Sequence, residues 1–286
     1  MKFLKLMRVK HYIKNLLIFL PIVFSGRLPE GALLLRNLYA LLSFSFLSSV
    51  IYVVNDILDV SKDRMHPTKR FRPIAAGDVS VSAALLLSAL LLALVAALNL
   101  LCDAGWASWA VLGVYLLINL VYSFGLKNIP IVDIAILAAG FLLRLLYGSA
   151  ITGIEISNWL ALTVISMAFY LGMGKRRNEL MRMDGHTSRA VLQHYNKSFL
   201  DRSMNMCLTL AIIFYALWSV DAATMERTGS GALVWTVPLV LLICFKYSLV
   251  IEGQSDGDPV EVLLKDKILL LLVGGFALLL VGILYF

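Results

Sequence analysis

The chain has 286 residues, of which 60% are hydrophobic and only 15% are charged. This composition excludes an ordinary soluble core and indicates a polytopic membrane protein. The formal net charge is +7, and the three cysteines lie far apart without any Cys-x-x-Cys spacing. Neither a zinc site nor a disulfide framework is indicated.

A helix needs about 20 apolar residues to cross roughly 30 Å of hydrocarbon. The sequence contains nine such segments, so we predict an all-α bundle of nine transmembrane helices that forms one integral-membrane domain over residues 1–286. The segments lie near 13–26, 36–57, 81–101, 106–125, 131–152, 157–174, 203–222, 231–250 and 268–286. The first is the weakest, because Pro21 interrupts it.

The basic residues orient this bundle. Most of the 25 lysines and arginines fall in the N-terminal segment and in alternate loops, above all in 58–80 and 174–202. The positive-inside rule therefore predicts a cytoplasmic N-terminus and a multi-pass protein of the inner (plasma) membrane whose active site faces the cytoplasm. The net charge is mainly this topological signal, so we expect no nucleic-acid partner. The sequence carries no signal for the oligomeric state.

Two residues at the entry to the first segment are candidates for substrate binding, Lys14 and Asn15. The preceding Arg8 and Lys10 are interpreted as anchors to anionic lipid.

An acidic array ends the second segment. Asp56, Asp59 and Asp63 follow Asn55 with spacings that place all three acids on one face of a continuous helix. Unpaired charges at a membrane boundary are costly. A charge at the centre of the bilayer costs about 2.5–3.5 kcal/mol. Mg²⁺ removes this penalty, and it commonly recruits substrate phosphates as further ligands. We therefore predict a Mg²⁺–diphosphate site whose metal ligands are Asn55, Asp56, Asp59 and Asp63.

A basic cluster follows directly, and its Lys69, Arg70 and Arg72 suit the same phosphates. The alternative is a solvated helix end whose acids pair with Lys62, Arg64 and Lys69.

Charged residues also flank the fifth segment. Tyr122 and Lys127 close the fourth segment, and Asp133 opens the fifth. Arg144 lies three turns into an apolar span, which marks a functional residue by default, and it could pair with Asp133 or with a phosphate. Lys127 could instead be a topological anchor.

After the sixth segment, Lys175, Arg176 and Glu179 could supply cations to a second phosphate group. The alternative is an i, i+4 pair between Lys175 and Glu179 on a helix surface. Further on, Asp258 and Pro259 resemble a helix N-cap and a first-turn proline.

Together these motifs resemble the UbiA-type intramembrane prenyltransferase superfamily, and within it the decaprenyl-phosphate phosphoribosyltransferases. The residues that carry the resemblance are Lys14-Asn15, 55–63, 66–77, Tyr122 to Lys127 with Asp133, 140–144, Lys175-Arg176 with Glu179, and 257–259. Ordinary members have a second aspartate-rich motif after helix 6, whereas this chain is basic at Lys175 and Arg176. Such a site suits extra phosphate groups.

The resemblance implies a Mg²⁺-dependent transfer of a 5-phosphoribosyl group from phosphoribosyl diphosphate to a polyprenyl phosphate of the decaprenyl type, with release of diphosphate. It implies catalytic roles for Asn55, Asp56, Asp59 and Arg144. It implies substrate binding by Lys14, Asn15, Asp63, Lys69, Arg70, Arg72, Tyr122, Lys127, Asp133, Lys175, Arg176 and Glu179.

Two alternatives remain at this point. A prenyltransferase with a polyprenyl diphosphate donor and an aromatic or other small acceptor would use the same acidic array. An ion-coupled transporter could also bind its ion with these acids, although transport sites usually lie near the bilayer midplane.

Overall fold

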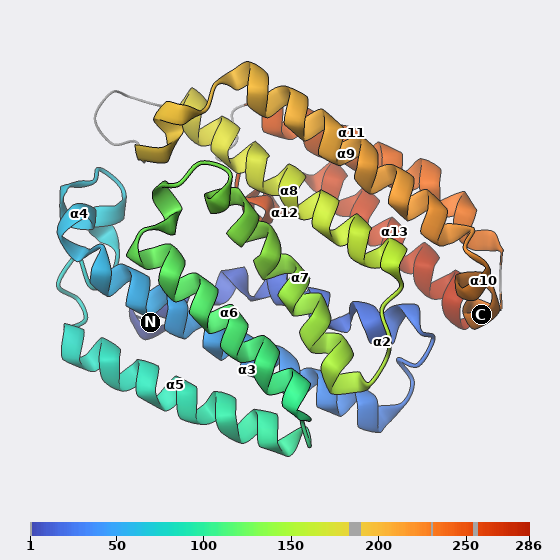
Figure 1. Ribbon diagram of the computed structural model, residues 1–286, viewed down its shortest axis with the longest axis horizontal. Helices are drawn as coiled ribbons and strands as arrows, with labels where there is room; N and C mark the ends of the chain where they lie inside the picture. Colours follow the sequence, from blue (N-terminus) through green and yellow to red (C-terminus); the bar gives the residue numbers. More distant parts are fainter. Residues whose placement is uncertain (1, 183–189, 230, 254–256) are drawn as a thin grey trace. The chain divides into compact units, whose positions relative to one another are not determined.

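The computed structural model describes residues 2–182, 190–229, 231–253 and 257–286, which are almost entirely helical (Figure 1). The chain forms two compact units. Unit 1 contains Met1–Ile22, Glu30–Lys127 and Leu143–Ile154, and unit 2 contains Val23–Pro29, Asn128–Leu142 and Glu155–Phe286.

Within the described residues, 7 helices are long and apolar enough to cross a membrane. They are Gly31–Leu58, Val81–Leu101, Trp106–Phe124, Val132–Thr152, Lys197–Ser219, Ala232–Glu252 and Lys267–Tyr285. Each overlaps a predicted segment, so the all-helical, multi-pass architecture is confirmed for these seven. The other two predicted spans, 13–26 and 157–174, are not among them, and the cytoplasmic N-terminus stays a prediction.

Unit 1 is built around the long helix α3. Its elements are α1 (Lys2–Met7), η1 (Val9–Phe19), α3 (Gly31–Leu58), α4 (Val60–Met65), η2 (Lys69–Phe71), α5 (Val81–Leu101), α6 (Trp106–Phe124) and the second half of α7 (Val132–Thr152). Helix α3 packs along α5 and also contacts α6 and η1 (Figure 1). In its core the ring of Phe44 lies 4.4 Å from that of Tyr115 and 5.6 Å from that of Tyr147.

The predicted first span is not a regular α-helix. The chain runs as the 3₁₀ helix η1 and then as the short α2 (Leu20–Phe24). Pro21 is the second residue of α2, which continues directly from η1. Polar bonds join η1 to α3: the hydroxyls of Tyr12 and Ser49 are 2.8 Å apart, and Asn15 donates to Ser45 at 2.8 Å.

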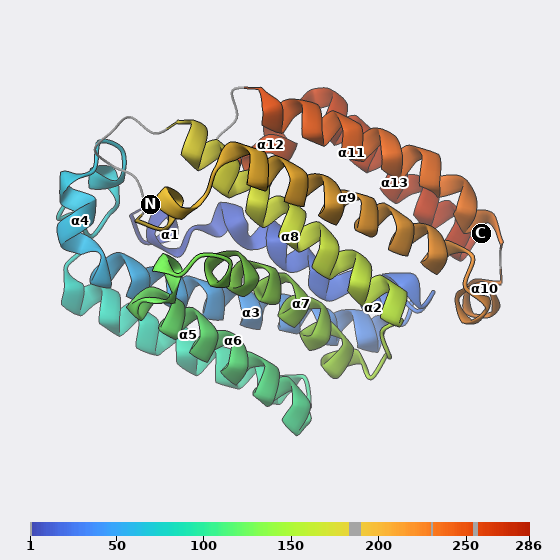
Figure 2. The same ribbon diagram turned by 45° about the horizontal axis from the view of Figure 1, so that its top comes forward.

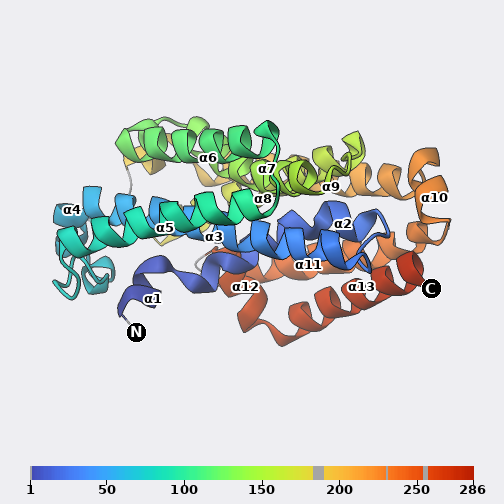
Figure 3. The ribbon, with the colours of Figure 1, turned by 90° about the horizontal axis from the view of Figure 1, so that it is seen from below.

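In unit 2, α8 (Asn158–Met181) packs along α9 (Lys197–Ser219) (Figure 2). Helix α11 (Val237–Glu252) contacts α9 and α13 (Lys267–Tyr285), and α12 (Pro259–Lys265) leads into α13 (Figure 3). The shorter elements are η3 (Leu126–Asn128), η4 (Ala190–His194), α10 (Ala222–Thr228) and η5 (Ala232–Thr236).

Helix α8 extends beyond the predicted 157–174 span, and the additional last two turns carry the basic motif. The predicted cap of α12 is confirmed: Asp258 accepts from the N–H of Val260 at 3.0 Å, and Pro259 occupies the first turn.

Candidate active site

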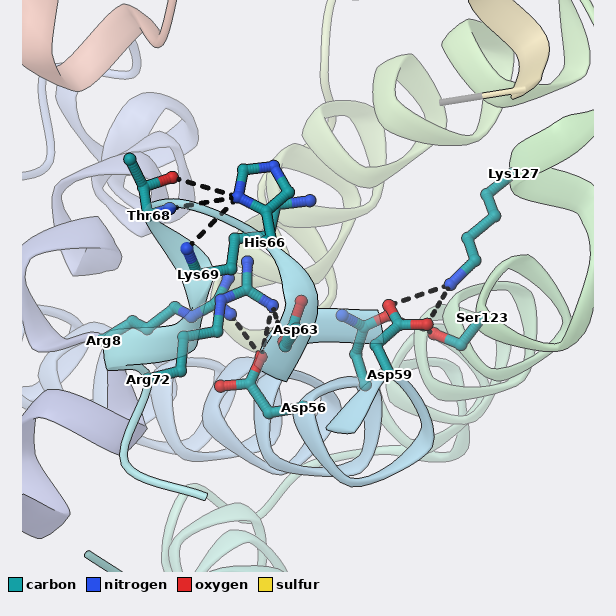
Figure 4. Close-up of polar contacts among 11 residues, drawn as sticks. Arg8, Asp56, Asp59, Asp63, His66, Thr68, Lys69, Arg72, Ser123 and Lys127 are labelled. Atoms are coloured by element: carbon teal, nitrogen blue, oxygen red, sulfur yellow. Dashed lines mark hydrogen bonds and ion pairs between the residues drawn. The ribbon is translucent and has the colours of Figure 1, made fainter. Parts of the chain in front are cut away.

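The acidic array lies at a break between two helices of unit 1. Helix α3 ends at Leu58, Asp59 has φ −93° and ψ 4°, and α4 begins at Val60. The prediction of one continuous helix with all three acids on one face is therefore wrong. Asp59 points away from the side on which Asp56 and Asp63 lie (Figure 4).

Asp56 and Asp63 share a cation. Nη1 of Arg72 donates to Oδ1 of Asp56 at 3.0 Å and to Oδ2 of Asp63 at 2.7 Å. A second guanidinium, that of Arg8, donates to the same Oδ1 of Asp56 at 2.5 Å. The two acids are 2% and 3% exposed, and carboxylates this buried persist as anions only when such partners compensate them.

The other two members of the array face α6. Nζ of Lys127 lies 2.8 and 2.9 Å from the two carboxylate oxygens of Asp59. Asn55 accepts from the hydroxyl of Ser123 at 3.3 Å. Lys127 is thus an ion-pair partner within the array rather than a topological anchor alone.

A pocket of about 330 Å³ opens beside Asp56. Its lining residues are Lys5, Arg8, Asp56, Thr68, Lys69, Phe71, Arg72 and Pro73. Four cations thus surround one carboxylate, which favours a ligand with several negative charges.

Lys5 and Arg8 were not predicted as site residues. Their spacing of three residues around the apolar Leu6 could have indicated them, because it places both cations near each other while Leu6 faces the core. Leu6 is fully buried with Val53 and Ile74. The sequence interpretation assigned this segment to lipid anchoring instead.

A histidine shapes the turn that carries Lys69. Nδ1 of His66 accepts from the backbone N–H groups of Thr68 at 3.2 Å and of Lys69 at 3.3 Å. Burial, and then the charge of Lys69, lower the pKa of His66. The ring is therefore neutral at pH 7, and only a neutral ring leaves Nδ1 as an acceptor.

The remaining predicted residues of this region are more peripheral. Arg70 is exposed, with its guanidinium 4.9 Å from the ring centre of Phe71. Lys14 and Tyr122 are half-buried on η1 and α6. None of the three lines the pocket.

Arg144 and Asn15 belong to a buried polar network of unit 1. Nε of Arg144 donates to Oδ1 of Asn15 at 2.7 Å, and Nη2 donates to the hydroxyl of Tyr115 at 3.1 Å. Arg144 is 6% exposed. These contacts connect α7, η1 and α6, and they suit a role in fixing η1.

In unit 2, the predicted Asp133, Arg176 and Glu179 form one network. Nε of Arg176 donates to Asp133 at 2.5 Å, and Nη1 donates to Glu179 at 2.8 Å. Tyr195 donates to Asp133 at 2.7 Å and accepts from the N–H of Ile131 at 2.6 Å. Burial, reinforced by the bond to Asp133, raises the pKa of Tyr195 to about 12.

Asp133 and Arg176 are completely buried. Lys175 is more accessible, and its Nζ lies 3.7 Å from Asp258. Gly257 has φ +75°, and a Cβ on it would lie 3.0 Å from Cα of Lys175. Glycine here therefore allows the α12 segment to approach α8 closely.

The acids of unit 1 offer a limited donor set for a metal ion. Within the described residues, no group of three or more His, Cys, Asp or Glu side chains could hold one. The structure does place Asp56 and Asp63 on a common cation, the guanidinium of Arg72. A pair of carboxylates fits Mg²⁺, which usually completes its shell with water and substrate phosphates.

Comparison with known proteins agrees with this fold. The UbiA prenyltransferase family matches residues 19–273. The chain is 36% identical to decaprenyl-phosphate phosphoribosyltransferase of Corynebacterium glutamicum over 93% of this chain and 81% of that protein. It is 34% identical to the protein of the same name from Mycolicibacterium smegmatis, over 94% and 88%.

Among solved structures, a UbiA homolog from Archaeoglobus fulgidus bound to DMAPP and Mg²⁺ superposes with a TM-score of 0.73 and 20% sequence identity, covering 99% of both chains. At this identity the likeness supports the fold alone. Because the family match covers most of the sequence, this chain is a multi-pass membrane transferase of the UbiA prenyltransferase family.

Proposed function

We propose that this chain transfers a 5-phosphoribosyl group from phosphoribosyl diphosphate to a polyprenyl phosphate and releases diphosphate. The observation that carries the proposal is the pocket in which Lys5, Arg8, Lys69 and Arg72 surround Asp56. The relatives that share a third of its sequence are named for this type of activity. Membership of a transferase family argues against an ion-coupled transporter.

In this proposal the pocket binds the diphosphate of the donor. Arg72 and Lys69 donate to its oxygens, and Asp63 holds Arg72 in place through the 2.7 Å bond. As the C1–O bond of the ribosyl group breaks, negative charge collects on the departing diphosphate, and the fixed cations stabilise it. An oxygen of the lipid phosphate forms the new bond to C1. That phosphate is already ionised near pH 7, so no general base is required.

Mg²⁺ would be held by Asp56 and Asp63, where it would neutralise further charge on the diphosphate. Asn55 and Asp59 remain predicted ligands, although in this structure Asn55 accepts a hydrogen bond from Ser123 and Asp59 pairs with Lys127. We also propose that the pocket faces the cytoplasm of the inner membrane, as the distribution of basic residues predicts.

The predicted catalytic role of Arg144 and the predicted binding roles of Asp133 and Arg176 have less support. Their burial favours structural roles. Lys175 keeps a stronger case for binding a phosphate, because it is only half-buried.

The test uses the purified full chain in detergent with Mg²⁺, radiolabelled phosphoribosyl diphosphate and a polyprenyl phosphate. Asp56→Asn is compared with wild type and with Lys62→Gln, a change at an exposed position of α4. The proposal expects label in the lipid phase for wild type and Lys62→Gln only. Product formed instead from a polyprenyl diphosphate and an aromatic acceptor would overturn it in favour of an ordinary prenyltransferase.

A further inference from the structure

Arg8 donates to Oδ1 of Asp56, the one carboxylate among the residues that line the pocket. Its Nη2 lies 2.5 Å from Oδ1 of Asp56, and Arg72 reaches the same oxygen at 3.0 Å (Figure 4). A divalent cation bound to Asp56 would lie on this oxygen or close beside it, where the guanidinium of Arg8 lies. Like charges this close repel strongly where water is scarce. Arg8 and a cation are therefore competitors for Asp56.

Several further features hold Arg8 close to Asp56. Its guanidinium lies 4.6 Å from the ring centre of Tyr52, within the range of a cation–π contact. Its backbone has φ 53° and ψ 46°, a left-handed conformation that a non-glycine residue adopts at a cost. On the preceding turn Leu6 is fully buried and Lys5 donates to the carbonyl of Phe71 at 3.2 Å.

We infer that Arg8 is a placeholder on Asp56 that discriminates against a bare divalent cation and favours a cation that arrives with a diphosphate. A bare cation displaces the guanidinium from Asp56 without offering it another anion. A cation–diphosphate complex brings phosphate oxygens, to which the displaced guanidinium can transfer while it stays in the pocket. Cation and diphosphate then bind with positive coupling. This inference rests on the proposed function, because it assumes that Asp56 binds the cation of a metal–diphosphate substrate.

The experiment measures Mn²⁺ binding to the purified full chain by electron paramagnetic resonance, with and without inorganic diphosphate. In Arg8→Gln we expect the affinity for Mn²⁺ alone to rise by about fivefold or more, and the gain in affinity on adding diphosphate to shrink by a similar factor. Arg8→Gly should behave in the same way. It also guards against misfolding, because glycine accepts the left-handed backbone.

Two matched variants separate the placeholder from the general field of the pocket. Lys5→Gln removes a charge from the same pocket without touching Asp56, and Lys2→Gln removes one that pairs with Asp78 outside it. Both should change Mn²⁺ affinity less than Arg8→Gln. An effect of Lys5→Gln equal to that of Arg8→Gln would overturn the inference, as would an unchanged affinity in both Arg8 variants.

Asp56→Asn distinguishes this failure from failure of the proposed function. If Asp56→Asn abolishes Mn²⁺ binding while the Arg8 variants match wild type, only the placeholder is overturned. If wild type and Asp56→Asn bind Mn²⁺ equally, Asp56 is not a metal ligand, and both the inference and the assignment beneath it are overturned.

Discussion

Nζ of Lys127 lies 2.8 Å from one carboxylate oxygen of Asp59 and 2.9 Å from the other, which ties the break after α3 to η3, the short helix that follows α6. Both side chains are about four-fifths buried. We expect Asp59→Asn and Lys127→Gln each to destabilise the protein, and the double variant to lose less than the sum. A double-mutant cycle in SDS unfolding should give a coupling of about 1 kcal/mol or more.

The exposed pair between Lys2 and Asp78 is the matched control for this cycle, since both residues are largely solvent-accessible. Its coupling should fall between about 0 and 1 kcal/mol. Strictly additive losses for Asp59 and Lys127 would show that the observed ion pair does not hold the break together.

A second prediction concerns the buried ion pair of unit 2. Arg176→Met would leave Asp133 fully buried without its guanidinium, which should cost about 3–5 kcal/mol of unfolding free energy. Lys175→Met removes a neighbouring charge that is partly exposed, and should cost about 1 kcal/mol or less. Thermal unfolding of the two purified variants compares them directly. Wild-type stability of Arg176→Met together with lost substrate binding would instead support the role predicted from the sequence.

The turn at His66 should weaken in acid. The pKa of His66 is lowered in the folded protein, chiefly by burial, so its contribution is intact above the unfolded value of about 6.5. As the pH falls below that value, the unfolded chain binds the proton more readily, and stability is lost until the pH passes the folded pKa. Once the intrinsic pH dependence of exchange is removed, the protection of the backbone amides of residues 68–72 should therefore fall between pH 7 and pH 5.

In His66→Asn a side-chain oxygen can accept in place of Nδ1 and does not titrate in this range. The acid-induced change in exchange should therefore be smaller than in wild type, once the intrinsic pH dependence of exchange is removed. An identical pH dependence in both proteins would assign the change to the neighbouring carboxylates.

A fourth prediction tests how closely η1 approaches α7. A Cβ on Gly148 would overlap the carbonyl oxygen of Ile18. Gly148→Ala should therefore lower the unfolding free energy by about 1–3 kcal/mol. Gly113 is also helical, but nothing lies within 4 Å of a Cβ placed there, so Gly113→Ala should cause no loss of stability. Equal melting temperatures for the two variants would contradict the close contact.

Hydrophobicity predicted the seven long apolar helices because a span depends on length and composition alone. It could not predict the form of 13–26, where backbone geometry rather than hydropathy distinguishes a 3₁₀ helix from an α-helix. The acidic array does lie at the end of α3, but counting i, i+3 and i+7 assumes a continuous helix, and α3 ends before Asp59.

Partner choice was the least predictable part of the site. Lys62 and Arg64 were closest in sequence to the acids, yet the observed partners are Arg72, which is 16 and 9 positions from Asp56 and Asp63, and the more distant Arg8 and Lys127, 48 and 68 positions from theirs. Sequence spacing gives no measure of such distances. The composition of the candidate site, acids beside cations, was recognisable in the sequence, whereas the pairing depends on how the segments that carry Arg8 and Lys127 fold back onto α3.

The 3₁₀ form of η1 sets a repeat length that matches α3. Three residues of a 3₁₀ helix advance about 6.0 Å, and four residues of an α-helix advance the same distance. Tyr12 and Asn15, three apart on η1, consequently meet Ser49 and Ser45, four apart on α3. An α-helical η1 would advance only about 4.5 Å between the same two residues, about 1.5 Å less than the rise between Ser45 and Ser49 on α3. One residue inserted between Tyr12 and Asn15 would therefore lengthen their separation along η1, and it would no longer match the separation of Ser45 and Ser49 along α3.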